Sequence, residues 1–64
     1  MNKEIEKFKW LRMTDDEVIN FWEEHNYAQA RYNRGRVAGW GFSTIEALRN
    51  FSNCEEQMIE RGLL

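Results

Sequence analysis

The chain has 64 residues, of which nine are Lys or Arg and eleven are Asp or Glu, so its formal net charge is −2. This length predicts a single small domain, residues 1–64, with a marginal hydrophobic core. A single cysteine, Cys54, excludes an internal disulfide, and a single histidine, His25, excludes a Cys/His metal cluster. We therefore expect no metal and no cofactor.

The charge is segregated along the chain. Residues 26–50 carry four arginines and one acid, whereas both flanks are acidic, which is unlike an evenly cationic nucleic-acid binder. The first residues are charged and no apolar run follows, so neither a signal peptide nor a membrane span is expected. Together with the lone thiol, this predicts a cytoplasmic protein.

Residues 2–12 contain only helix-compatible residue types. Ile5, Phe8 and Leu11 are three apart, as one side of a helix requires, which favours a helix. The alternation around Phe8 and Trp10 also fits a short edge strand with both rings inward, so the strand stays open as an alternative for residues 5–12.

A capping box precedes the next element. Thr14 can accept a hydrogen bond from the backbone of Glu17, whose side chain can reach back to the Thr14 amide. This predicts a helix over residues 15–25, with Asp15 and Asp16 at the positive end of its dipole. Its apolar stripe has helical spacing and comprises Val18, Phe21, Trp22 and His25.

Residues 27–42 are interpreted as a β-hairpin. Asn33-Arg34-Gly35 forms its expected tip, because Gly35 can adopt the left-handed conformation of a bulged loop. In that register one face of the hairpin is apolar and is expected to be buried, with three alanines that leave room for a helix: Ala28, Ala30, Ala38, Trp40 and Phe42. A two-residue turn would exchange the faces of one strand relative to the other.

A second capping box, Ser43 with Glu46, predicts a helix over residues 44–60. Its apolar stripe comprises Ala47, Phe51, Cys54 and Met58, and Arg61-Gly62 is a plausible stop. The expected fold is therefore α+β, with a two-stranded antiparallel hairpin packed on helices. The order is α-α-β-β-α, or β-α-β-β-α if residues 5–12 form an edge strand.

Three groups of residues suggest a binding or catalytic site, but each is better explained by a structural role. The Gly39–Ser43 bend lacks the third glycine of a dinucleotide fingerprint and the lysine of a P-loop. His25 has no nucleophile near it in the sequence, and Cys54 lies on an apolar stripe beside two acids. No catalytic residue is expected.

Contact surfaces are the stronger functional hypothesis. Arginine and aromatic side chains, which are enriched at protein interfaces, gather on the expected hairpin: Arg31, Tyr32, Arg34, Arg36 and Trp40. Asp15 and Asp16 form a second, acidic patch suited to a basic partner. The same arginines and rings could stack on bases and pair with phosphates, and a solvated turn is the remaining interpretation.

Residues 27–51 resemble the strand-to-helix junction of HicB-like antitoxin domains. The matching residues are Gly39, Gly41, Ser43, Thr44, Glu46, Ala47, Leu48, Asn50 and Phe51. The resemblance implies a sheet backed by a helix, with a protein-binding role and no catalysis. The junction is also similar to the end of a double-stranded-RNA-binding domain, but Thr44, Ile45 and Leu48 occupy its phosphate-gripping lysine positions, which argues against RNA binding.

In size, acidity and lack of an enzyme motif, the chain resembles small bacteriophage accessory proteins. The leading hypothesis is a non-enzymatic protein-binding module, such as an inhibitor of a host enzyme or defence complex. The alternative is a nucleic-acid-binding protein that uses the arginine-bearing hairpin. Homo-oligomerisation that completes a larger sheet is a further expectation.

Overall fold

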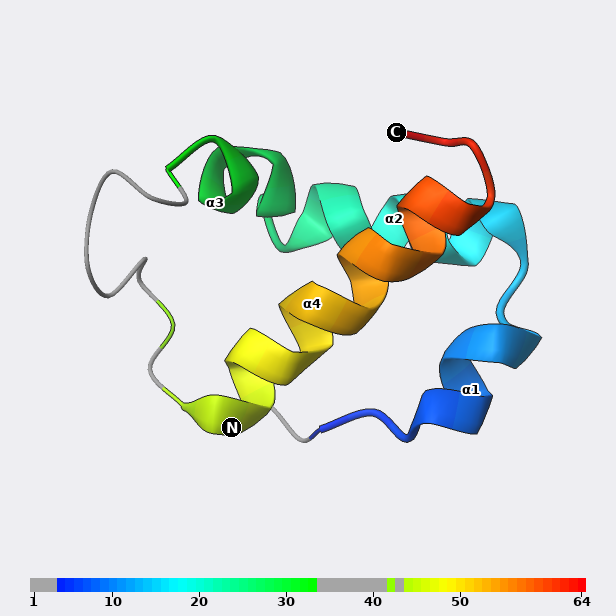
Figure 1. Cartoon of the computed structure of the whole chain (residues 1–64), viewed down its shortest axis with the longest axis horizontal. Coiled ribbons are helices and arrows are strands. Elements are labelled where there is room, and N and C mark those ends of the chain that lie inside the picture. Colours follow the sequence, from blue (N-terminus) through cyan, green and yellow to red (C-terminus); the bar gives the residue numbers. More distant parts are fainter. Residues whose placement is uncertain (1–3, 34–41, 43) are drawn as a thin grey trace.

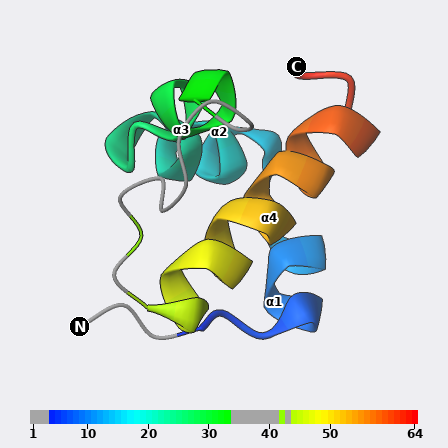
Figure 2. The same cartoon turned by 60° about the vertical axis from the view of Figure 1, so that its left-hand side comes forward.

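The computed structural model describes residues 4–33, 42 and 44–64. Within these described residues, four helices follow one another (Figure 1): α1 (Lys7–Arg12), α2 (Asp15–Glu24), α3 (Tyr27–Asn33) and α4 (Ile45–Glu60). α1 and α2 pack against α4, the longest helix, and α3 packs against α2. The turned view places α2 and α3 together on one side of α4 (Figure 2). None of these described helices is long and apolar enough to cross a membrane.

The expected α+β class and its hairpin are wrong. The described residues contain no strand, and the first predicted strand is helix α3; residues 34–41, with the predicted turn and most of the second strand, lie outside the described part of the chain. Tyr27 and Ala30, three residues apart, are both buried, whereas Ala28 is exposed, so burial has a helical period. Alanine, glutamine and arginine within α3 are also good helix formers.

The edge-strand alternative is wrong too, since residues 7–12 are helical. The favoured helix is confirmed in type but begins at Lys7, and its expected inner face is not the buried one. Phe8 and Leu11 are 68% and 53% exposed, whereas Trp10 is buried. A six-residue helix is too short for an apolar stripe to fix its orientation. Burial of the large Trp10 ring therefore decides which side of α1 faces the core.

The capping box of α2 is confirmed. Thr14 Oγ1 accepts from the Glu17 amide at 3.2 Å, and Glu17 Oε1 accepts from the Thr14 amide at 2.8 Å. The helix ends one residue earlier than expected, at Glu24, with His25 as its C-cap. Asn26 then adopts a positive φ of 54° and turns the chain into α3.

Replacing Thr14 by alanine is expected to lower the free energy of unfolding by about 1 kcal/mol, because one orphan amide of α2 loses its acceptor. Urea unfolding followed by circular dichroism measures this loss. Thr14→Ser is the matched control, since it keeps the hydroxyl and should retain most of the stability. Equal losses in both variants would contradict the role of the cap.

The same contact gives α2 a pH dependence. The backbone and then the hydroxyl of Thr14 hold the pKa of Glu17 below its usual 4.5. A lowered folded-state pKa means that the carboxylate stabilises the fold above pH 4.5 and loses that effect as the pH falls through the folded-state value. Wild type and Glu17→Gln should therefore differ in stability at neutral pH and converge in acid.

Helix α4 is confirmed over nearly its whole expected length. Its N-cap is Thr44, one residue after the expected Ser43, and Thr44 Oγ1 accepts from the Ala47 amide at 3.0 Å. Gly62 ends the helix with a positive φ of 71°, as the expected stop requires. The amides of Gly62 and Leu63 return to the carbonyls of Ile59 and Met58, which is a Schellman motif.

The core lies between α4 and the other helices. Its buried residues are Trp10, Val18, Trp22, Tyr27, Ala30, Phe51, Cys54 and Met58. Trp10 and Trp22, whose environment the sequence leaves open, are therefore core residues. Phe51 is at the centre of an aromatic cluster, with its ring centroid 5.2 Å from those of Tyr27 and Phe42 and 6.1 Å from that of Trp22.

Candidate functional site

An open pocket lies beside α3, and we call it the α3 pocket. It encloses about 390 Å³ and is lined by Trp22, Ala28, Arg31, Tyr32 and Leu64. Helix α3 supplies three of these residues at positions i, i+3 and i+4, which places them on one helical face. The pocket thus draws on α2, α3 and the C-terminal residue, which only the tertiary fold brings together.

The α3 pocket combines apolar walls with one cation. Arg31 Nε lies 3.3 Å from Glu55 Oε2, and this contact directs the guanidinium toward α4. The Arg31 side chain remains 45% exposed, whereas that of Glu55 is largely buried. Tyr32 is also exposed. An apolar group that enters the pocket would therefore meet Trp22 and Leu64, with a positive charge and a phenol ring at the rim.

The structure brings together two of the seven expected contact residues, Arg31 and Tyr32. Arg34, Arg36 and Trp40 lie outside the described residues, so their placement stays a prediction. Three pocket residues, Trp22, Ala28 and Leu64, were not predicted from the sequence. The helical spacing of Ala28, Arg31 and Tyr32 could have indicated their shared face, but residues 27–33 were interpreted as a strand.

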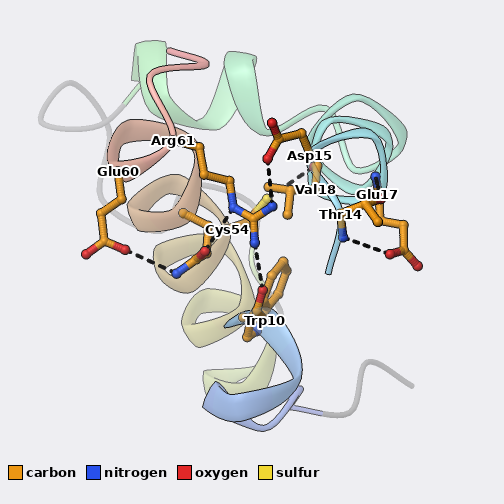
Figure 3. Close-up of polar contacts among 9 residues, drawn as sticks. Trp10, Thr14, Asp15, Glu17, Val18, Cys54, Glu60 and Arg61 are labelled. Carbon is orange, nitrogen blue, oxygen red and sulfur yellow. Dashed lines mark hydrogen bonds and ion pairs between the residues drawn. The ribbon is translucent and has the colours of Figure 1, made fainter. Parts of the chain in front are cut away.

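The expected acidic patch does not line the α3 pocket. Asp15 Oδ1 accepts from Arg61 Nη1 at 2.9 Å, so its carboxylate is engaged at the end of α4 (Figure 3). Arg61 Nη2 also donates to the Trp10 carbonyl at 3.2 Å. Asp15 thus joins helices within the chain, while Asp16 is exposed in the first turn of α2.

A second exposed surface lies on α1. Its outward residues are Lys7, Phe8, Lys9, Leu11 and Arg12, which we call the α1 surface. Within residues 4–33, 42 and 44–64, none of its three cations forms an ion pair. The α1 surface therefore presents two large apolar side chains among unneutralised positive charges.

The thiol and the imidazole are held by structural contacts. Cys54 is buried, and its Sγ lies 3.8 Å from the Val18 carbonyl. Burial raises the pKa of the Cys54 thiol to about 12. The His25 ring stacks on Phe21 with centroids 4.0 Å apart, and its Nδ1 lies 2.9 Å from the Phe21 carbonyl oxygen. In the parts of the chain that the structure describes, no three His, Cys, Asp or Glu side chains are grouped to hold a metal.

Cys54 is expected to react far more slowly with a thiol reagent in the folded chain than in urea, since its thiolate is disfavoured and its sulfur is enclosed. Following the release of the chromophore from a disulfide reagent measures both rates. Asn20→Cys provides the comparison, because position 20 is exposed on α2. Similar rates at positions 20 and 54 would contradict the burial of Cys54.

Comparisons of this chain with protein-family models, curated proteins and solved structures found no match. The resemblance of residues 27–51 to HicB-like domains therefore stays a prediction, and the strand that it implies at residues 27–33 is replaced by α3.

Proposed function

We propose that this chain is a non-enzymatic protein-binding module that receives an apolar side chain of its partner in the α3 pocket. The observation that carries the proposal is the composition of that pocket, in which a tryptophan, a tyrosine and a half-exposed arginine meet. These three residue types dominate binding energy at protein interfaces. Blocking a host enzyme or defence complex remains the form of this function that the sequence predicts.

Each lining residue has a distinct part in this binding. Trp22 and Leu64 offer apolar contact area inside the pocket, and the exposed Tyr32 ring can stack on an aromatic or arginine side chain at the rim. Arg31 can donate to a second carboxylate besides that of Glu55, because its guanidinium has five donors. The preferred partner segment is therefore an apolar side chain next to an acid.

The test is a comparison of captured proteins. The immobilised chain and its Arg31→Glu and Ala28→Trp variants are incubated with bacterial lysate, and the retained proteins are quantified by mass spectrometry. The first variant reverses the rim charge, and the second fills the pocket from an exposed position of α3. We expect a defined protein that the wild type retains and both variants lose at least tenfold.

Asn20→Glu serves as the control, because Asn20 is exposed on α2 and does not line the pocket. It should retain the captured protein in full. A partner that binds both pocket variants as well as the wild type would remove the α3 pocket from the proposal.

Nucleic-acid binding is the second candidate, and the α1 surface is the observation that favours it. Lys7, Lys9 and Arg12 are exposed cations without a described ion pair, and Phe8 offers a ring on which a base can stack. The acidic residues elsewhere on the chain oppose this function through the net charge of −2.

Fluorescence anisotropy of a labelled single-stranded oligonucleotide tests this second candidate. Binding should weaken steeply as salt rises, and Lys9→Glu should weaken it further while Arg31→Glu leaves it unchanged. An unchanged anisotropy at low salt would exclude this function for the α1 surface.

A further inference from the structure

Helix α4 is apolar on its inner side and also along one flank. Its inner side carries Phe51 and Cys54 in the core, while Ile45, Leu48 and Ile59 are 63%, 37% and 54% exposed. At 3.6 residues per turn, these three side chains and that of Ser52 fall within about 60° of one another. We call this row, Ile45, Leu48, Ser52 and Ile59, the outer stripe.

The described part of the chain leaves the outer stripe exposed, since Ile45, Leu48 and Ile59 each keep more than a third of their surface accessible. A surface helix normally turns a polar side to water. Three large aliphatic side chains in one row on such a helix therefore mark a contact surface.

The outer stripe is complementary to itself when two copies of α4 run antiparallel and cross at Ser52. Ile45 of one copy then lies opposite Ile59 of the other, at both ends of the contact. Ser52 faces Ser52 at the centre, where its small side chain lets the helices approach closely. Each Leu48 lies between these positions, at the level of Glu56 of the other copy, and adds its side chain to the apolar contact.

The flanking charges favour the same arrangement. Arg49 and Glu56 are both exposed, on the same side of the outer stripe and seven residues apart. In the antiparallel pair, Arg49 of each copy lies near Glu56 of the other. In a parallel twofold pair, Arg49 and Glu56 of the two copies would lie on opposite flanks of the contact and could not pair, so these opposite charges favour the antiparallel direction.

We propose that a second copy of this chain covers the outer stripe and forms a twofold antiparallel homodimer through α4. Twofold dimers are the commonest soluble oligomers, and their contact uses the same patch on both copies. The outer stripe shares no residue with the α3 pocket, so this proposal stands apart from the proposed function. A single pair of helices makes a small interface, so the dimer should dissociate on dilution.

Sedimentation equilibrium of the full chain tests the dimer. The apparent mass should rise from one chain to two as the concentration increases through the micromolar range. Ile59→Arg places a charge opposite Ile45 and should hold the chain as a monomer at every concentration. Asn20→Arg, which adds the same charge at an exposed position of α2, should dimerise like the wild type.

Charge exchange tests the antiparallel direction. Arg49→Glu and Glu56→Arg should each raise the dissociation constant at least threefold, and the double variant should restore it, because opposite charges then meet again. In a parallel dimer, positions 49 and 56 of the two copies would not meet, so each single variant would leave the dissociation constant nearly unchanged.

Cysteine cross-linking tests the crossing point independently of affinity. Ser52→Cys should form a disulfide between two copies when an oxidant is added, whereas Asn20→Cys should not, and the wild-type Cys54 is too buried to react. Circular dichroism confirms that each variant is folded. A mass of one chain throughout the concentration range, or equal cross-linking at positions 20 and 52, would overturn the proposal.

Discussion

Replacing Phe51 by alanine is expected to leave most of the chain unfolded at room temperature. Phe51 is fully buried, and its ring contacts the rings of Trp22, Tyr27 and Phe42. Removing a buried phenylalanine ring costs about 3–5 kcal/mol, which includes the cavity that remains. A domain of this size rarely has more than about 3–5 kcal/mol of stability in total. The loss therefore approaches the whole free energy of folding.

The measurement is the helical signal in circular dichroism, followed as urea is added. Phe51→Ala should have little of the native signal even without urea, and Phe51→Leu should unfold at a lower urea concentration than the wild type. Phe8→Ala is the matched control, since Phe8 is exposed and its loss should change the stability by less than about 0.5 kcal/mol. Comparable effects at positions 8 and 51 would contradict the position of the core.

Removing the Arg61 guanidinium is expected to have the second largest effect. Arg61 is mostly enclosed and donates to three groups: the Asp15 carboxylate, the Trp10 carbonyl and Gln57 Oε1. These contacts join the end of α4 to the end of α1 and the start of α2 (Figure 3). Arg61→Met keeps the chain length but leaves these acceptors without their donor, which should cost about 1–3 kcal/mol.

Two comparisons separate charge from geometry in this effect. Arg61→Lys keeps the charge but cannot donate to all three acceptors, so it should restore only part of the stability. Arg49→Met removes a more exposed ion pair with Glu4 and should cost less than about 1 kcal/mol. The unfolding of the Arg49 and Arg61 variants is measured at low protein concentration, so that the proposed dimer does not contribute, because Arg49 also flanks the outer stripe. An equal loss in Arg49→Met and Arg61→Met would show that Arg61 does not join the helices as described.

The two binding proposals rest on different residues and can be tested separately. The α3 pocket is lined by residues of α2, α3 and Leu64, whereas the outer stripe lies on α4 alone. Loss of the captured partner in Arg31→Glu with an intact dimer would support the pocket independently. A monomer that still captures the partner would overturn only the homodimer.

Local sequence signals determined the ends of the long helices. The Thr14 capping box and Gly62 act within one helical turn of themselves, so they can be recognised in the sequence without the fold. At the start of α4 the sequence indicated a cap one residue too early, at Ser43 instead of Thr44. The amphipathic spacing of residues 15–24 and 45–60 is long enough to separate a helical period from an alternating one.

Tertiary packing decided the secondary structure of residues 27–33 and the buried side of α1. The seven residues 27–33 fit either a strand or a helix by sequence, and the packing of the Tyr27 ring against Phe51 and Trp22 selects the helix. The same reason explains α1, where burying Trp10 turned Phe8 outward.

Part of the candidate site could likewise be predicted from the sequence, and part depends on the tertiary structure. Composition alone singled out Arg31 and Tyr32, because their residue types suit interfaces. The α3 pocket also needed Trp22 and Leu64, which are separated from α3 in sequence and meet it only where α2, α3 and the C-terminus converge. The sequence by itself thus determined residue chemistry and helix ends, while the tertiary structure decided which side chains share a surface, since that depends on contacts between distant segments.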